Sequence, residues 1–276
     1  MSPSINHHRE GDGPPLVLLH GVGHHWQAWR PVIALLRGEF DVIACDSPGF
    51  GRSAPLSDSI EPTISAYTDA FEWFFAEIGL ERPHVAGNSM GGAIALELAR
   101  RRAIASASAF SPAGFWTLPE LRYCQFSLGT LSKTPAALRP LVAALARTRA
   151  GRRALFAQSF GHPTRMPAEE AVATLRDAWQ APAMAGALKA FDSYRYVDGE
   201  QSRSPSVTVA WGAKDRLLPY RLQAPRARAL LPWARHVTLG TGHVPFWDDP
   251  AAVAEVIRSC ARAGDGEPRA ASPART

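Results

Sequence analysis

Short aliphatic runs recur along the chain, and each is bounded by glycine, proline, aspartate or serine. Because these runs are apolar at consecutive positions, they are typical of strands buried on both faces of a parallel sheet. Between them, apolar positions recur with a helical period of about 3.6 residues. The predicted strands are Leu16–His20, Val42–Asp46, His84–Gly87, Ala105–Phe110, Val207–Trp211 and His236–Leu239, and the predicted helices are Trp29–Leu36, Ile64–Ile78, Gly91–Arg102 and Pro250–Ala263. This alternation predicts an α/β fold with a mostly parallel, doubly wound sheet.

The alternation stops between residues 114 and 204. This segment is rich in alanine, leucine and arginine, contains scattered prolines, and has no run typical of a strand. It is too long for a simple crossover and too apolar for a disordered insertion. We therefore expect an inserted helical cap at 114–204 on a core formed by 1–113 and 205–263. The low-complexity residues 264–276 are expected to form a disordered tail.

Composition narrows the class of protein. The chain has 276 residues, 46% of them hydrophobic, which is enough for one sizeable core. No apolar run approaches the roughly 18 residues of a membrane span, and the first residues lack the apolar stretch of a secretory signal. The three cysteines, Cys45, Cys124 and Cys260, are widely separated, which argues against a disulfide framework or a zinc site. These features predict a cytoplasmic protein without a membrane partner.

The net charge of +5 belongs to one segment. Residues 114–204 hold 12 basic and seven acidic residues, while the rest of the chain is balanced at 18 of each. The basic residues alternate with alanine and leucine at helical spacing, which favours solvated helix faces over attraction of acidic ligands. No nucleic-acid-binding motif accompanies them, so we expect no nucleic-acid partner.

One stretch carries the features of a reactive serine. Residues 84–92 read HVAGNSMGG, a strand, a sharp turn and the start of a helix, with G-x-S-x-G at the turn. At Gly87 and Gly91 we expect chain segments to approach so closely that no side chain would fit, and we expect Ser89 to adopt a strained backbone conformation. Its hydroxyl would then lie at the carboxyl edge of the sheet, where open α/β folds bind ligands. Ser89 is therefore the candidate nucleophile; the alternative interpretation is that Ser89 is an ordinary serine in a turn.

A serine hydroxyl needs a base, and the base needs an orienting carboxylate. His243 lies on a glycine-rich loop after the last predicted strand, and Asp215 follows the strand before it. The alternatives are a structural histidine and a turn-forming aspartate. The other acids near His243, Asp248 and Asp249, are expected to cap the final helix. The histidines rejected as bases include His7 and His8, in a start expected to be flexible, and His84, His162 and His236.

Backbone N–H groups complete the predicted site. The loop Gly21–Gly23 follows the first predicted strand, so Val22 N–H, together with Met90 N–H, is the expected oxyanion hole. Adjacent His24 and His25 are expected to point differently, as polar loop residues rather than metal ligands, and no metal or cofactor is implied. Substrate-pocket candidates are Trp26, Phe115, Trp116 and Phe246, with packing of the cap onto the sheet as the alternative.

Five motifs together resemble the α/β-hydrolase superfamily, in its serine esterase and C–C hydrolase-like branch with a helical cap. They are HGVGHHW, DSPGFGRS, GNSMGG, WGAKD and GHVPFWDDP. The resemblance implies that Ser89 is the nucleophile, Asp215 the acid and His243 the base, in the chain order of this family. It also implies that Asp46–Ser53 is a structural turn. The serine nucleophile argues against dehalogenases and epoxide hydrolases, which use aspartate. Only about 15 residues precede LVLLH, fewer than the family's first hairpin needs, which leaves open whether the first strand is missing.

The expected reaction is hydrolysis of a carboxylic ester of a small, largely apolar substrate through an acyl-enzyme, with lactones and thioesters as close relatives. The first alternative is hydrolysis of a C–C bond in a vinylogous diketone, because GNSMGG resembles the elbow of meta-cleavage-product hydrolases. Those enzymes usually carry tryptophan directly after the histidine, whereas Val244 and Pro245 follow it here. The second alternative is a small-molecule binding protein that carries the triad. The oligomeric state is left open.

Overall fold

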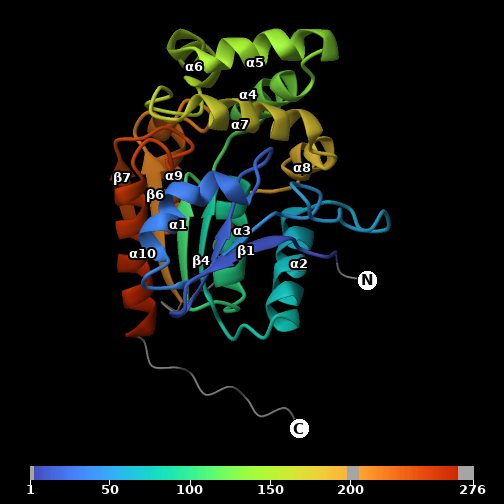
Figure 1. Ribbon diagram of the computed structural model, residues 1–276. Coiled ribbons are helices and arrows are strands. Elements are labelled where there is room, and N and C mark those ends of the chain that lie inside the picture. The colour runs from blue at the N-terminus through green and yellow to red at the C-terminus, as the bar shows by residue number, and fades with distance from the viewer. Residues whose placement is uncertain (1–2, 198–204, 267–276) are drawn as a thin grey trace.

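The computed structural model describes residues 3–197 and 205–266. Its centre is a seven-stranded sheet in the order β1-β3-β2-β4-β5-β6-β7 (Figure 1). The strands are β1 (His7–Glu10), β2 (Pro15–Leu19), β3 (Asp41–Cys45), β4 (His84–Asn88), β5 (Ser106–Phe110), β6 (Ser206–Gly212) and β7 (Arg235–Leu239). From β3 to β7 all neighbours are parallel, which confirms the predicted α/β architecture and its six strands.

The edge strand β1 was not predicted. It pairs antiparallel with β3, with His7 opposite Cys45, so the expectation of a flexible start at His7 and His8 is wrong. The segment is held by packing as well as by the ladder, because the ring of His8 stacks on Trp26 with centroids 4.4 Å apart. Within residues 3–197, a single strand precedes β2, where the family's hairpin would supply two.

Helices cover both faces of the sheet because neighbouring residues of a buried strand point in opposite directions. Leu16 and Leu18 belong to one core cluster with α1 (Arg30–Leu36) and α10 (Pro250–Asp265), and a 3-10 turn (Trp26–Trp29) leads into α1. Val17 and Leu19 belong to the other cluster, with α2 (Ile64–Glu77), α3 (Met90–Arg100) and α9 (Tyr220–Leu230). The last of these helices was not predicted.

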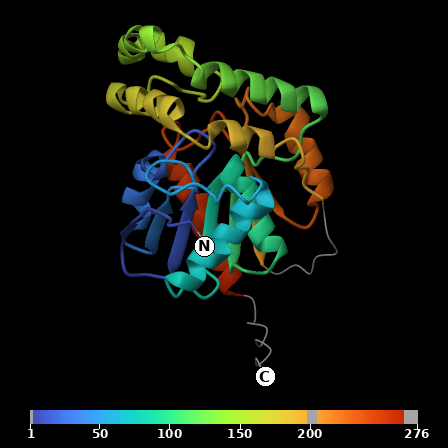
Figure 2. The ribbon, with the colours of Figure 1, turned by 90° about the vertical axis from the view of Figure 1, so that its right-hand side faces the viewer.

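The segment from 114 to 197 contains helices and no strand, and it is called the cap below. It contains α4 (Leu118–Ser132), a 3-10 turn (Ala136–Leu138), α5 (Arg139–Arg147), α6 (Arg149–Phe156), α7 (Ala168–Gln180) and α8 (Met184–Ala190). These helices lie together over one end of the sheet (Figures 1 and 2). Helix α10 continues to Asp265, past the predicted end of the core at 263. The described residues do not include 267–276 of the predicted tail or 198–204 of the predicted cap. None of the helices in the described ranges combines the length and the apolar character needed to cross a membrane.

Candidate active site

Ser89 lies in the turn between β4 and α3. Its backbone has φ 54° and ψ −113°, a conformation that a non-glycine residue adopts only under strain. The flanking glycines make the turn sterically feasible. A Cβ on Gly87 would lie 2.0 Å from the carbonyl oxygen of Gly91, and a Cβ on Gly91 would lie 2.4 Å from that of Leu19. The turn therefore presses the start of α3 against the ends of β2 and β4, with Ser89 at the contact.

Asp215 and His243 form a buried pair next to this turn. His243 Nδ1 lies 2.8 Å from Asp215 Oδ2, and the two side chains are 3% and 0% exposed. The other carboxylate oxygen, Oδ1, accepts hydrogen bonds from the backbone N–H groups of Leu217 at 3.0 Å and Leu218 at 2.8 Å. These two donors fix the carboxylate, so a single oxygen is left to orient the imidazole.

Ser89 and His243 line one cavity beneath the cap, which brings together the three side chains named from the sequence. The cavity is bordered by the turn after β2, the Ser89 turn, the His243 loop and residues of the cap. Its lining residues are Gly21, Val22, His24, Asn88, Ser89, Leu128, Ser159, Leu217, His243 and Val244. The arrangement places a hydroxyl and an imidazole with a buried carboxylate partner at the same space, as acyl transfer by a serine requires.

The side chain of Asn88 joins the loops that carry Ser89 and His243. Its Nδ2 donates to the carbonyl oxygens of Phe110, at 3.1 Å, and His243, at 2.9 Å. The residue before the candidate nucleophile thus holds the backbone of the candidate base. In the sequence, the position of Asn88 next to Ser89 is the one signal that could have pointed to this role.

The turn after β2 is fixed by a neutral histidine. The Nε2 atom of His20 accepts a hydrogen bond from Ser47 N–H at 2.9 Å, so its Nδ1 carries the proton that it donates to Gly21 O at 2.8 Å. Burial lowers the pKa of His20 to about 4, which keeps the ring neutral. Because the C=O and N–H of a trans peptide point in opposite directions, holding Gly21 C=O also sets the direction of Val22 N–H. This loop borders the Ser89 cavity, and the N–H of Met90 begins helix α3, where it has no acceptor within the helix.

The order of the elements and the position of this site agree with a known family. A sequence profile described as the Alpha/beta hydrolase family matches residues 16–256. The chain belongs to this family. Its curated relatives include the pimeloyl-(acyl-carrier protein) methyl ester esterase of Methylococcus capsulatus, to which this hydrolase is 28% identical over 250 residues, 86% of this chain and 90% of the relative.

Solved structures share the fold of this hydrolase over most of its length. An esterase from Thermogutta terrifontis superposes with a TM-score of 0.71 at 21% identity, covering 94% of this chain and 93% of that chain. A meta-cleavage product hydrolase from Pseudomonas fluorescens superposes with a TM-score of 0.70 at 19% identity, covering 92% and 94%. At these identities the likeness establishes the fold, and the esterase relatives support a hydrolase.

The segment Asp46–Ser53 of this hydrolase forms a tight turn around one carboxylate. Asp46 accepts hydrogen bonds from Trp26 N–H at 2.8 Å, Asn6 Nδ2 at 2.7 Å and Arg52 N–H at 3.0 Å. Ser53 Oγ donates to the carbonyl oxygen of Asp46 at 2.7 Å. These contacts serve the architecture, as the resemblance to the family implied.

Asp248 does not cap the final helix of this hydrolase, which corrects the expectation. Its carboxylate accepts hydrogen bonds from the backbone N–H groups of Gly161, at 2.7 Å, His162, at 2.8 Å, and Gly242, at 2.7 Å. Asp249 alone caps α10, accepting from Ala252 N–H at 3.0 Å. Asp248 therefore fastens a cap loop to the residue that precedes His243.

The four aromatic pocket candidates are not among the residues that line the Ser89 cavity. Phe246 packs on Trp29 with ring centroids 3.8 Å apart, and Phe115 stacks on Tyr196 at 5.3 Å. Trp116 packs on Phe191 and donates its indole N–H to the carbonyl oxygen of Tyr194. Trp26 stacks on His8, as described above. In this hydrolase these rings contribute to packing, which was the alternative interpretation.

Proposed function

We propose that this chain is a serine hydrolase that cleaves a carboxylic ester of a small, largely apolar substrate. The observation that carries the proposal is the convergence of Ser89 and His243 on one cavity, with Asp215 Oδ2 2.8 Å from the far nitrogen of the imidazole. The apolar part of the cavity lining supports the substrate class, since Val22, Leu128 and Leu217 would contact an alkyl or aryl chain.

In the proposed first step, Ser89 Oγ attacks the ester carbonyl carbon while His243 Nε2 takes the hydroxyl proton. The Asp215 carboxylate stabilises the imidazolium that forms, and the N–H groups of Val22 and Met90 bind the developing oxyanion. Collapse of the tetrahedral intermediate breaks the bond to the alcohol oxygen, which leaves with the proton from His243. The product of this step is an acyl-enzyme on Ser89.

In the second step, water attacks the acyl carbon and gives its proton to His243, and collapse returns the proton to Ser89 Oγ as the carboxylic acid leaves. Lactones and thioesters follow the same sequence with a different leaving group. The methyl ester esterase of Methylococcus capsulatus, a relative of this chain, supports ester chemistry at the level of the family.

The test combines turnover with labelling. We expect release of p-nitrophenol from short-chain p-nitrophenyl esters, and loss of this activity by a factor on the order of 10⁶ in Ser89→Ala with unchanged thermal unfolding. A fluorophosphonate should label the peptide that contains Ser89. The internal control is Ser159, a second serine that lines the same cavity and should remain unlabelled.

The same experiments separate the alternatives. Hydrolysis of a dienoate diketone without hydrolysis of the esters would replace the proposal with the C–C hydrolase function. Failure of the fluorophosphonate to label Ser89 in folded protein would instead favour a binding protein.

A further inference from the structure

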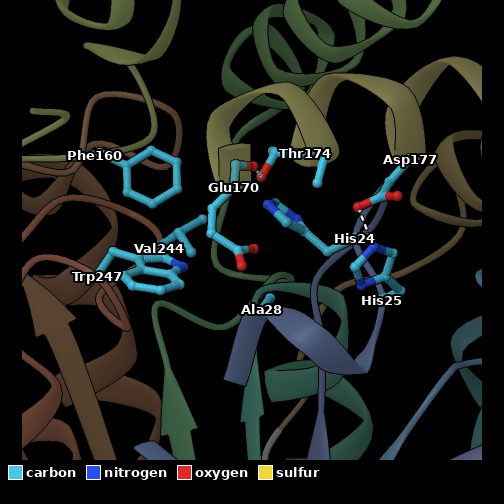
Figure 3. A pocket seen from close by; sticks show the side chains of 10 residues that line it. His24, His25, Ala28, Phe160, Glu170, Thr174, Asp177, Val244 and Trp247 are labelled. Atoms are coloured by element: carbon cyan, nitrogen blue, oxygen red, sulfur yellow. Dashed lines mark hydrogen bonds and ion pairs between the residues drawn. The ribbon is translucent and has the colours of Figure 1, made fainter. Parts of the chain in front are cut away.

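A second cavity lies next to the candidate catalytic cavity, on the side of helix α7 (Figure 3). His24 and Val244 line both cavities, so they form the boundary between them. The remaining lining comes from the start of the 3-10 turn, from α7 and from loops beside them. These residues are His25, Ala28, Phe160, Glu170, Ala173, Thr174, Asp177 and Trp247.

His24 presents an unpartnered acceptor at this boundary. Its Nε2 atom is buried and makes no hydrogen bond with the described residues. The ring does make a hydrogen bond with the backbone of Val22, and because Nε2 has no partner, this bond must be made by Nδ1. Burial, followed by the neighbouring histidines, lowers the pKa of His24 to about 3, so the ring is neutral. With the proton on Nδ1 directed at a carbonyl, Nε2 carries a lone pair.

The cap side of the second cavity is also rich in acceptors. Thr174 Oγ1 donates its proton to the carbonyl oxygen of Glu170 at 2.9 Å, so its lone pairs remain available. The Glu170 carboxylate forms an ion pair with Arg30, with Oε1 3.2 Å from Nη1. Asp177 Oδ2 lies 2.5 Å from His25 Nε2. Figure 3 shows His24 directed into the cavity and His25 turned toward Asp177. Trp247, whose indole N–H is a donor, also lines the cavity.

We propose that this second cavity is a subsite for a hydrogen-bond donor, a hydroxyl or an ammonium group, carried by the substrate of the hydrolase. The inference rests on the proposed function and narrows its substrate class to esters, lactones or thioesters with such a group on an otherwise apolar chain. A buried acceptor without a partner is unfavourable, and a donor from the ligand removes that cost where an alkyl group does not. The scissile carbonyl lies at Ser89, and the chain passes Val244 to place the donor at His24 Nε2, in the cavity that Thr174 and Glu170 also line.

The test uses p-nitrophenyl esters of linear acids of increasing length, each as the parent acyl chain, its ω-hydroxy form and its ω-amino form. We expect one chain length at which the hydroxy or amino ester has a kcat/KM about 10-fold above the parent, or about 1.4 kcal/mol. His24→Phe should remove this preference. Thr174→Val, which keeps the side-chain shape, should reduce it, so the test stands even if the His24 variant fails to fold.

A matched control and a charge variant sharpen the result. Thr130 on α4 donates to the carbonyl four residues earlier, at 2.8 Å, as Thr174 does, but its side chain is exposed and lines neither cavity, so Thr130→Val should leave the preference unchanged. Glu170→Gln distinguishes the two donors, because it should lower the preference for the amino ester more than that for the hydroxy ester.

Failure of the subsite and failure of the proposed function give different results. Equal kcat/KM for all three forms at every chain length would overturn the subsite while hydrolysis stands. Binding of the same esters to Ser89→Ala, measured by calorimetry, does not depend on turnover. If the wild-type protein hydrolyses none of them but the variant binds the donor-bearing ester more tightly in a His24-dependent manner, the subsite stands and the proposed reaction falls.

Discussion

Replacement of Asp215 by asparagine tests the proposed mechanism with almost no change in shape. In the native protein the two backbone N–H groups of Leu217 and Leu218 point at Oδ1. An asparagine keeps its carbonyl oxygen at that position, because the reverse orientation would direct the amide NH₂ at these donors. The NH₂ group therefore faces His243 Nδ1, which must become the acceptor. The proton then moves to Nε2, the atom that has to take the proton of Ser89.

The size of the effect follows from these contacts. Two lost hydrogen bonds at about 1–1.5 kcal/mol each disfavour the reversed amide by about 2–3 kcal/mol, so only about 1% of molecules hold it. The remainder carry the imidazole in the wrong tautomer. This population alone accounts for a loss of about 10², and the neutral amide also lacks the charge that stabilises the imidazolium. In serine-protease triads the equivalent change lowers kcat by about 10⁴, or about 5.5 kcal/mol, and we expect a loss of this order here.

The assay is kcat for a p-nitrophenyl ester, with thermal unfolding measured on the same preparations. Asp215→Asn should unfold within a few degrees of the wild-type protein, because the backbone contacts of Oδ1 survive. A folded variant that retains activity within 10-fold of wild type would show that Asp215 does not orient the base, and the mechanism would have to be abandoned.

Three further predictions concern the turn and the buried histidines. In urea unfolding, Ser89→Gly should be more stable than Ser89→Ala by about 1 kcal/mol. Both variants lack the hydroxyl, but only glycine adopts the positive φ at this position without strain. Equal stabilities would mean that the turn stores no strain. Gly91→Ala should destabilise by about 2 kcal/mol or more, because its Cβ would contact Leu19 O, and calorimetry showing a native-like Tm would contradict this. In the folded protein His20 and His24 have pKa values of about 4 and about 3, so below about pH 6.5 the unfolded chain binds protons that these two rings do not. The free energy of unfolding should therefore decrease as the pH is lowered, by roughly 3 kcal/mol per histidine between pH 6.5 and pH 4. His20→Asn should show a weaker dependence on pH, and an unchanged dependence would exclude this assignment.

The buried strands were predictable because both of their faces are apolar, a pattern that few other structures share. Strand β1 was missed because its four residues, HHRE, are polar and lie at an edge where the sequence carries no signal of burial. Helix α9 was missed because it contains Pro225 and is rich in arginine. In both cases the pairing or packing partner, rather than local sequence, decides the structure.

The meeting of Ser89, His243 and Asp215 was predictable because each follows a strand, and parallel strands end at the same edge of the sheet; their catalytic roles stay a proposal. The roles of Asp248 and His24 were not predictable, because each depends on residues of the cap that lie far away in the sequence. Asp248 accepts a hydrogen bond from Gly161 N–H, and the two residues are 87 positions apart in the sequence. A cytoplasmic location and the absence of nucleic-acid and membrane partners stay predictions from composition.

The carboxylate of Asp248 makes the cap and the histidine loop mechanically interdependent. Asp248 is 1% exposed in the structure. If the cap segment at Gly161 and His162 were to move outward, this anion would lose two of its three backbone donors. Water would have to enter to solvate it, next to the residue that precedes the imidazole. Outward movement of this cap segment would therefore disturb the position of His243, so we expect substrate access and the placement of His243 to change together when the segment is engineered.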